Sequence, residues 1–235
     1  FVDTFNRYYE PENVRSAINV LRAAGYFPFI PESKKNSNPL CCGRTYLSNG
    51  LVDQARFEVD NILTTFEPYL KKGISVVGLE PSCILSFRDE LPSLIQSQSS
   101  DLLKENSFTF EELLVQKVKN INFKSLNEKI LIHGHCHQKA FDVVKPIEQI
   151  LNKVPELKFE TINTSCCGMA GAFGYDKSTY DISMKMANDK LIPKKKKYKA
   201  NVKVIADGTS CRCQIKDGLN IQAIHLAKFL DNNII

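Results

Sequence analysis

Several motifs that identify common chemistries are missing from the sequence. It contains no glycine-rich phosphate loop of the P-loop or GxGxxG type, and no GxSxG nucleophile elbow. A nucleotide cofactor bound by this chain alone is therefore not expected, and neither is a hydrolase built on a nucleophile elbow.

Long apolar runs and a targeting segment are missing as well. No run reaches the length of a membrane span, and the N-terminus carries no charged-then-apolar signal. The chain begins at Phe1 rather than at a methionine, from which we expect a piece of a longer polypeptide. These features predict a cytoplasmic protein without a membrane span; peripheral attachment at the inner face of a membrane is the alternative.

The composition is that of an ordinary globular protein. The 235 residues are 43% hydrophobic and 24% charged, which excludes disordered, collagen-like and coiled-coil chains. Much of the net charge of +5 comes from one run, Lys194–Lys199 ("KKKKYK"), which we interpret as a solvated loop before a strand. No nucleic-acid-binding motif accompanies this run, so nucleic acid is not an expected partner.

Cysteine is abundant for a chain of this size. There are eight cysteines, and adjacent pairs dominate the pattern. Because no secretory signal indicates an oxidising compartment, metal binding or redox chemistry is favoured over structural disulfides.

Strand and helix signals alternate along the chain. Strands are predicted over 26–31, 73–79, 129–134, 157–162 and 200–207, and helices over 11–24, 51–69, 86–95, 110–118, 140–152, 180–190 and 218–230. Such alternation favours parallel sheets with right-handed crossovers. The predicted fold class is α/β: two related repeats, each a small mainly parallel sheet flanked by helices.

The repeat is visible in the cysteine motifs. "LCCGR" at Leu40–Arg44 returns as "SCCGM" at Ser165–Met169. Likewise, "EPSC" at Glu80–Cys83 is matched by "GTSC" at Gly208–Cys211. We therefore expect a first repeat over 1–100, a connection over 101–127 and a second repeat over 128–235. The cysteines follow predicted strands, so they are expected at the carboxyl ends of the sheets.

The second repeat carries four cysteines that we predict to be metal ligands. They are Cys136, Cys166, Cys167 and Cys211, from three strand-end loops. Four converging thiolates suit either a tetrahedral zinc ion or a [4Fe–4S] cluster. Adjacent cysteines can both ligate only from an irregular loop, and Gly168 supplies the backbone freedom that shapes one.

The first repeat offers a second candidate site. Cys41, Cys42 and Cys83 occupy equivalent positions, with Gly43 in the loop-shaping place of Gly168. The position equivalent to Cys136 falls near Asp3 or Thr4. Three thiolates could bind a metal with a water, carboxylate or substrate as fourth ligand. A vestigial site and a thiol-redox role are the alternatives.

Three histidines surround Cys136 in the stretch "HGHCHQK". They are His133, His135 and His137. Imidazoles here could ligate a metal, donate hydrogen bonds to cluster sulfurs, or bind an anionic substrate or prosthetic group. Hydrogen bonding within the loop is the remaining interpretation.

The motifs together resemble a known family. "LCCGR", "EPSC", "HGHCHQKA", "SCCGMAGAFGY" and "DGTSCRCQI" are similar to the cysteine-rich CCG domain of heterodisulfide reductase and of the iron–sulfur subunits of glycolate oxidase and anaerobic glycerol-3-phosphate dehydrogenase. The resemblance is closest to the C-terminal region of fused FAD/iron–sulfur dehydrogenases of D-2-hydroxy acids, such as D-lactate or D-2-hydroxyglutarate. It covers essentially the whole chain.

The sequence departs from the family pattern at two kinds of position. The first cysteine of each CxxC is replaced, by Glu80 in the first half and by Gly208 in the second, and the lone cysteine of the first half is missing. Only the second half therefore keeps four thiolates, which supports one cubane cluster rather than a five-thiolate one.

The resemblance implies an electron-transfer domain rather than a self-sufficient catalyst. A C-x2-C-x2-C run of the ferredoxin type is absent. FAD is expected on the same polypeptide or on a partner chain, and the electron acceptor would be a quinone or a soluble carrier. Two rivals stay open: a zinc-stabilised structural or interaction module, and a thiol–disulfide redox domain similar to heterodisulfide reductase.

Overall fold

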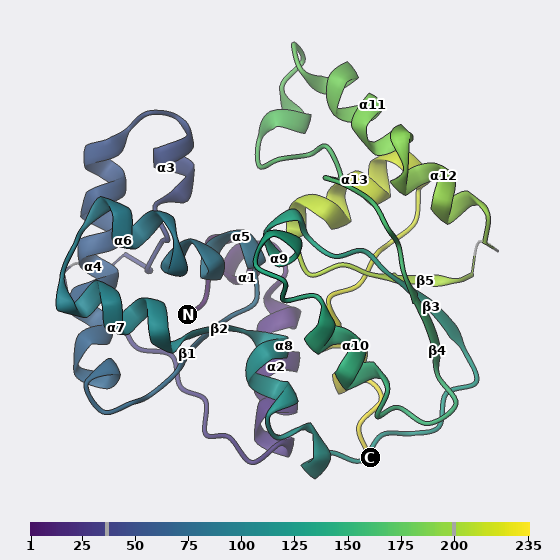
Figure 1. Cartoon of the computed structure of the whole chain (residues 1–235), viewed down its shortest axis with the longest axis horizontal. Helices are drawn as coiled ribbons and strands as arrows, with labels where there is room; N and C mark the ends of the chain where they lie inside the picture. Colours follow the sequence, from purple (N-terminus) through teal and green to yellow (C-terminus); the bar gives the residue numbers. More distant parts are fainter. Residues whose placement is uncertain (36–37, 199–200) are drawn as a thin grey trace. The chain divides into compact units, whose positions relative to one another are not determined.

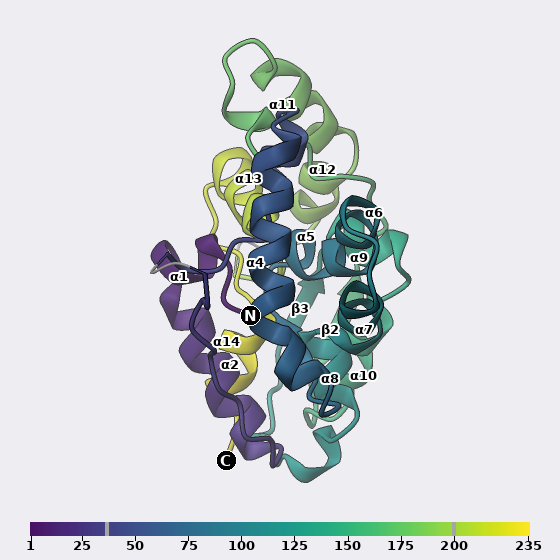
Figure 2. The ribbon, with the colours of Figure 1, turned by 90° about the vertical axis from the view of Figure 1, so that its left-hand side faces the viewer.

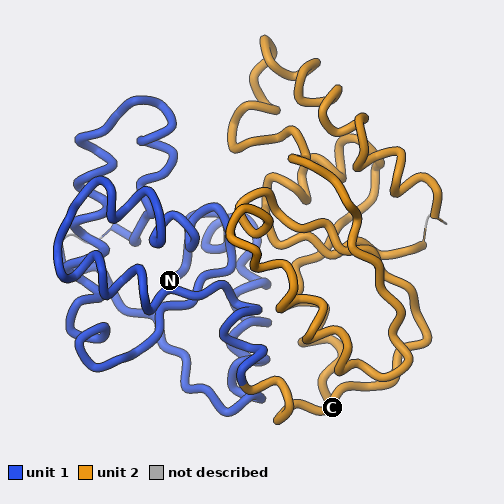
Figure 3. The backbone as a smooth tube through the Cα atoms, viewed as in Figure 1, with its two compact units in different colours: residues 1–116 blue, residues 117–235 orange. Residues whose placement is uncertain are grey.

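The computed structural model describes residues 1–35, 38–198 and 201–235, and it divides the chain into two compact units. Unit 1 is Phe1–Gln116 and unit 2 is Lys117–Ile235 (Figures 1 and 3). The boundary falls inside the segment 101–127, for which a connection is predicted. Residues up to Gln116 belong to unit 1 because this segment supplies a strand of its sheet and a helix next to it.

Unit 1 is a two-stranded parallel sheet flanked by helices. Its strands are β1 (Val76–Gly78) and β2 (Ser107–Thr109), paired with Val76 opposite Ser107. Its helices are α1 (Thr4–Tyr8), α2 (Pro11–Ala23), α3 (Arg44–Ser48), α4 (Val52–Leu70), α5 (Pro81–Ile84), α6 (Glu90–Leu94), α7 (Gln98–Asn106) and α8 (Phe110–Val115), with a 3-10 turn η1 (Leu85–Arg88). The 19-residue α4 is the blue helix of Figure 2; its apolar positions Val59, Ile62 and Phe66 are buried.

The strand predicted over 26–31 is not formed. Residues 26–31 have no regular structure, and the side chain of Phe27 is 95% exposed. Pro28 and Pro31 explain the difference, because proline has no backbone N–H to contribute to a ladder. The large apolar residues of this stretch are typical of a buried strand, but the chain forms a surface segment here.

Unit 2 is a three-stranded parallel sheet flanked by helices. Its strands are β3 (Lys129–Ile132), β4 (Lys158–Thr161) and β5 (Lys203–Ile205), in the order β4-β3-β5. Its helices are α9 (Cys136–Ala140), α10 (Lys145–Leu151), α11 (Tyr180–Asp189), α12 (Leu191–Lys196), α13 (Thr209–Leu219) and α14 (Leu226–Asp231), with 3-10 turns η2 (Val118–Asn120) and η3 (Phe173–Tyr175). The central strand β3 is buried from Ile130 to Ile132, as expected of a strand covered on both faces.

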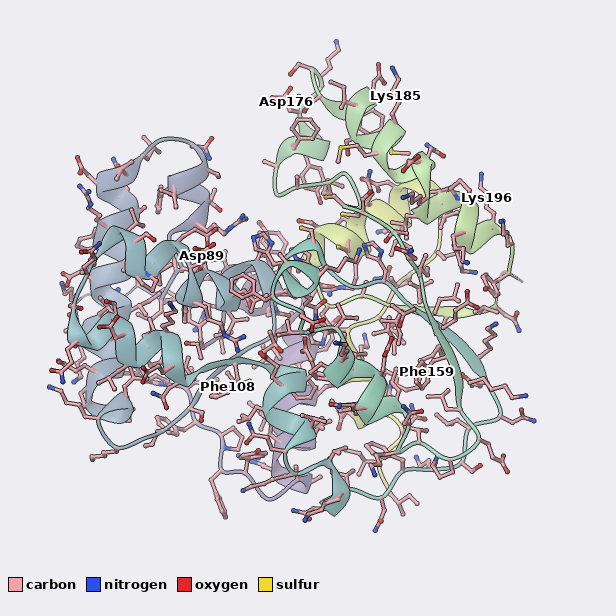
Figure 4. The ribbon with its side chains drawn as sticks, in the orientation of Figure 1. Asp89, Phe108, Phe159, Asp176, Lys185 and Lys196 are labelled. Carbon is pink, nitrogen blue, oxygen red and sulfur yellow. The ribbon has the colours of Figure 1, made fainter. Side chains whose placement is uncertain are left out.

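The lysine run is helical where a loop was predicted. Its first three residues, Lys194–Lys196, form the last turn of α12, and Lys199 lies outside the described residues. The apolar residues Leu191 and Ile192 are buried and anchor the start of this helix. Cations in a last turn also complement the helix dipole. Figure 4 shows Lys196 at the exposed edge of unit 2.

The closing helix predicted over 218–230 is two helices. α13 ends at Asn220, which adopts the left-handed conformation with φ of +52°. The chain then runs beside β5, where Ile224 forms a bridge with Ile205, before α14 begins at Leu226. A left-handed asparagine is a common helix stop, and the apolar periodicity continues across it.

The fold class predicted from the sequence is confirmed. Two small parallel sheets are each flanked by helices. Among the described helices, none has both the length and the apolar character that crossing a bilayer requires.

Candidate metal centre

The four cysteines predicted as ligands in unit 2 each follow a parallel strand. Cys136 begins α9 after β3, Cys166 and Cys167 lie in the loop after β4, and Cys211 lies in the first turn of α13 after β5. Because the three strands are parallel neighbours, their carboxyl ends meet at one edge of the sheet. The three loops therefore bring the four thiols together.

The four thiols form a chain of contacts. Side-chain hydrogen bonds join Cys136 to Cys166, Cys166 to Cys167, and Cys167 to Cys211. All eight cysteines of the protein are free thiols, so none of these contacts is a disulfide. Cys167 and Cys211 are buried, whereas Cys136 and Cys166 are half-buried. The cluster thus lies at the edge of the core with one side partly open.

The hydrogen bonds among the four thiols divide them into two with lowered pKa values and two with raised pKa values. Hydrogen bonds with Cys136 and Cys167 lower the pKa of Cys166, and a hydrogen bond with Cys167 lowers the pKa of Cys211. The pKa values of Cys136 and Cys167 are raised, first by their hydrogen bonds with Cys166 and then by burial. Since the thiolate is the metal ligand, Cys166 and Cys211 are ready to bind, and the other two would release protons on binding.

Gly168 gives the double-cysteine loop its shape. Its φ is +97°, and a Cβ at this position would overlap the backbone oxygen of Ser183. Its backbone N–H is directed at the Sγ of Cys166, at 3.4 Å. Any other residue would have a strained backbone at this φ, and its Cβ would displace the loop away from α11. Glycine is therefore required for both reasons.

His133 lies at the end of β3 beside the buried thiols. Its backbone N–H continues the sheet by donating to Ile205. One ring nitrogen and the sulfurs of Cys167 and Cys211 lie within 4.8 Å of one another. The side chain is 1% exposed, and its Nδ1 is 3.1 Å from Thr164 Oγ1. The ring also pairs with the Cys211 thiol and lowers its pKa, although the buried Nε2 lies outside strict hydrogen-bond geometry.

His135 and His137 lie on the more exposed side of the cluster. Their rings stack at 5.1 Å, and their Nδ1 atoms are 3.8 and 3.7 Å from the Sγ of Cys136. Nδ1 of His135 accepts from the backbone N–H of His137 at 3.2 Å, which caps α9. A Cβ at position 208 would overlap the His135 ring, so only glycine at this position leaves space for the imidazole.

Lys139 holds the loop that carries the cysteine pair. Its Nζ donates to the carbonyl oxygen and the Oγ1 of Thr164, at 2.7 and 3.2 Å, and to the carbonyl oxygen of Ser165 at 2.8 Å. Burial lowers the pKa of Lys139, and the nearby thiols of the cluster act in the opposite direction. The ammonium group therefore positions the loop and places a positive charge near thiolates.

The three cysteines of unit 1 form a smaller cluster. Cys42 Sγ lies 3.2 Å from Cys83 Sγ, and a hydrogen bond with Cys42 raises the pKa of Cys41. Gly43 repeats the loop geometry, with φ of +75° and its N–H directed at Cys41 Sγ at 3.5 Å. Near Cys83 the structure places two buried carboxyl groups, those of Asp3 and Glu80.

Three polar side chains near the unit 2 cluster are missing from the sequence-based set of site residues. They are Gln138, Lys139 and Thr164. The first two belong to the "HGHCHQKA" motif, so the motif itself was the available signal. No local pattern indicates Thr164, because its partners are distant in the sequence. Cys213, by contrast, packs against the apolar core of unit 2 as a half-buried thiol.

The family comparison matches the geometry of unit 2. The family model of the CCG cysteine-rich domain matches residues 130–216, a range that contains all four thiols, β4, β5 and all of β3 except Lys129. The match leaves the cysteines of unit 1 outside it.

Curated relatives are similar to most of this chain. A subunit of the anaerobic glycerol-3-phosphate dehydrogenase of Escherichia coli is 25% identical over 96% of this chain and 56% of its own length. A D-2-hydroxyglutarate dehydrogenase of Haemophilus influenzae is 26% identical over 91% of this chain and 21% of its own length. An uncharacterized iron–sulfur protein of Methanocaldococcus jannaschii is 26% identical over 87% and 38%. The chain thus spans about half or less of the length of these relatives.

The donor set of the CCG domain fits an iron–sulfur centre. Four thiols joined in a chain of contacts could supply the ligands of a cubane cluster, and the N–H of Gly168 is a donor for the sulfur of Cys166. A tetrahedral zinc ion would fit the same thiols, so the geometry by itself defines the site and not the metal.

Proposed function

We propose that the chain is an iron–sulfur electron-transfer domain of a flavin-linked dehydrogenase. The observation that carries the proposal is the convergence of four free thiols from three strand ends, inside a CCG domain related to iron–sulfur proteins. The proposed cofactor is one [4Fe–4S] cluster held by Cys136, Cys166, Cys167 and Cys211. When bound, such a cluster accepts and releases one electron at a time.

The residues around the thiols suit a negatively charged cluster that is partly shielded from water. Burial of Cys167 and Cys211 keeps water from the inner side of the cluster, and the N–H of Gly168 stabilises the sulfur of Cys166. Lys139 offsets part of the negative charge of four thiolates. Half-buried Cys136 and Cys166 leave one side accessible, which is where a redox partner could approach.

The partners proposed for this domain follow from its relatives. The names of two relatives describe dehydrogenases of glycerol 3-phosphate and of D-2-hydroxyglutarate. We infer an FAD domain, on the rest of the polypeptide or on a partner chain, that oxidises a small hydroxy acid or hydroxy phosphate. The cluster would then pass electrons to a quinone or a soluble carrier. Unit 1 would be an incomplete copy of the CCG repeat.

The test is the metal content of anaerobically prepared protein. We expect about four irons and four labile sulfides per chain and a brown absorption spectrum, which is the stoichiometry of one cubane cluster. Cys211→Ser should lose the iron. Cys213→Ser is the matched control, because this thiol lies on the same helix and packs against the core instead.

Two other metal contents would contradict the proposal. Zinc without labile sulfide would indicate a structural module. Iron that survives Cys211→Ser would assign the cluster to other ligands.

A further inference from the structure

Three side chains form an oriented path that ends at the buried thiols of the CCG domain. Lys139 Nζ lies 3.2 Å from Thr164 Oγ1, and Thr164 Oγ1 lies 3.1 Å from His133 Nδ1. A ring nitrogen of His133 lies within 4.8 Å of the sulfurs of Cys167 and Cys211. His133 and Thr164 are 1% and 6% exposed, so bulk water does not compete for these contacts.

The proton positions along this path follow from what each group can donate. An ammonium has three N–H donors and no acceptor, so Lys139 donates to Thr164 Oγ1. The hydroxyl proton of Thr164 then has one acceptor among the residues that the structure describes, the Nδ1 of His133. A neutral imidazole that accepts at Nδ1 carries its proton on Nε2.

We propose that Lys139 and Thr164 hold His133 in the Nε2–H tautomer, which donates a hydrogen bond to the sulfur of Cys167 or Cys211 in the loaded centre. The proposal rests on the proposed function and names the role of His133 at that site. His133 is then a positioning and tuning residue and not a metal ligand. Its ring already pairs with the Cys211 thiol, and the buried Nε2, which lies outside strict hydrogen-bond geometry, would donate to a sulfur once the thiolates are bound to iron.

Ligation by His133 would require a different arrangement of protons. Nε2 would have to be unprotonated, so Nδ1 would carry the proton and donate to Thr164 Oγ1. That oxygen would then accept from both His133 and Lys139, and its own proton would lack an acceptor among the described residues. A buried hydroxyl without an acceptor is unfavourable, so the contacts support the arrangement in which Nε2 carries the proton.

The functional consequence concerns the reduced cluster. A donor at a ligand sulfur stabilises the more negative oxidation state and so raises the reduction potential. Losing one such hydrogen bond should change the ratio of reduced to oxidised cluster by about tenfold at a fixed ambient potential, as expected for a bond to a charged group.

The experiment compares matched variants of the iron-loaded protein prepared anaerobically. Thr164→Val keeps the shape of the side chain and removes the hydroxyl, and Thr164→Ser keeps the hydroxyl. His133→Leu removes the donor, and His133→Gln keeps an N–H in nearly the same place. Each variant is measured by redox titration, iron analysis, and pulsed EPR of the reduced cluster after exchange into heavy water.

We expect Thr164→Val and His133→Leu to lower the potential and to weaken the coupling to an exchangeable deuteron. Thr164→Ser and His133→Gln should keep both close to the wild type. Iron content should stay unchanged in all four variants, since His133 is not a ligand.

Three results would overturn the inference. They are an unmoved potential in His133→Leu with iron retained, a strong nitrogen coupling in the wild type that disappears in His133→Leu, and loss of iron in His133→Leu with Thr164→Val unaffected. Absence of iron from the wild type would contradict the proposed function itself, which separates the two failures.

Discussion

The two units place similar cysteine loops in different electrostatic environments. In both, the glycine after the cysteine pair has a positive φ and directs its N–H at the first sulfur, as Gly43 does for Cys41 and Gly168 for Cys166. Yet the pKa of Cys41 is raised and that of Cys166 is lowered. Identical backbone geometry therefore does not produce identical thiols.

The difference arises from what surrounds each loop. Cys166 accepts hydrogen bonds from two other thiols and lies near His135. Cys41 lacks an equivalent of Cys136, and its hydrogen bond with Cys42 and its burial raise its pKa, with a smaller contribution from Glu58. All four histidines of the sequence lie in unit 2. In unit 2 the pKa values of Cys166 and Cys211 are lowered, whereas in unit 1 those of all three cysteines are raised.

The largest effect expected from this contrast is on metal binding. Cys167→Ser should abolish iron binding, because it removes the thiol that contacts both Cys166 and Cys211. Cys42→Ser, the equivalent change in unit 1, should leave the iron content unchanged. Both variants are compared by iron and sulfide analysis, with circular dichroism to verify folding. Equal losses in the two would mean that unit 1 also ligates iron.

A second prediction tests how strictly the loop needs its glycine. Gly168→Ala should lower the free energy of unfolding of unit 2 by several kcal/mol, of order 3, because positive φ and the overlap with Ser183 act together. Gly171→Ala is the control: its φ is +67° but no atom lies within 4 Å of the new Cβ, so about 1 kcal/mol is expected. Chemical denaturation of both variants measures the difference. Similar losses would show that the overlap relaxes at little cost.

The smallest effect concerns the carboxyl group that stands in unit 1 near the position equivalent to Cys136. Burial, and then the charge of Glu80, raise the pKa of Asp3. A raised pKa in the folded state stabilises the fold at low pH, and this contribution is lost as the pH rises through the folded value. Relative to Asp3→Asn, the wild type should therefore lose about 1 kcal/mol of stability between pH 4 and pH 7. Asparagine keeps an oxygen that can cap α1, where Asp3 accepts from Asn6 N.

Chemical unfolding curves of the wild type and Asp3→Asn at pH 4 and pH 7 measure how the difference in their free energies of unfolding changes with pH. A stability difference that is constant with pH would mean that Asp3 is not protonated in the folded state over this range.

Local patterns predicted the sheet of unit 2 well. The runs at β3 and β5 are short and rich in isoleucine or valine, β4 (KFET) has a single large apolar residue, and helical stripes separate the three, so strand placement followed directly. Parallel strands also share one carboxyl edge, which is why loops far apart in the sequence were expected to meet there. These inferences need only periodicity and chain direction.

Features that depend on tertiary contacts were not predictable in this way. The segment 26–31 has strand-like residues, but its prolines and its place on the surface leave it irregular. The path from Lys139 through Thr164 to His133 joins three elements and has no sequence pattern of its own. Such contacts become visible only when the backbone is placed.

The glycine at position 208 links the choice of residue in two parts of unit 2 that are distant in the sequence. A Cβ there would overlap the ring of His135, so any lineage that places cysteine or alanine at 208 must move or replace this histidine. The two positions should therefore covary among descendants of a common ancestor: glycine with histidine, and a larger residue with something smaller or differently directed.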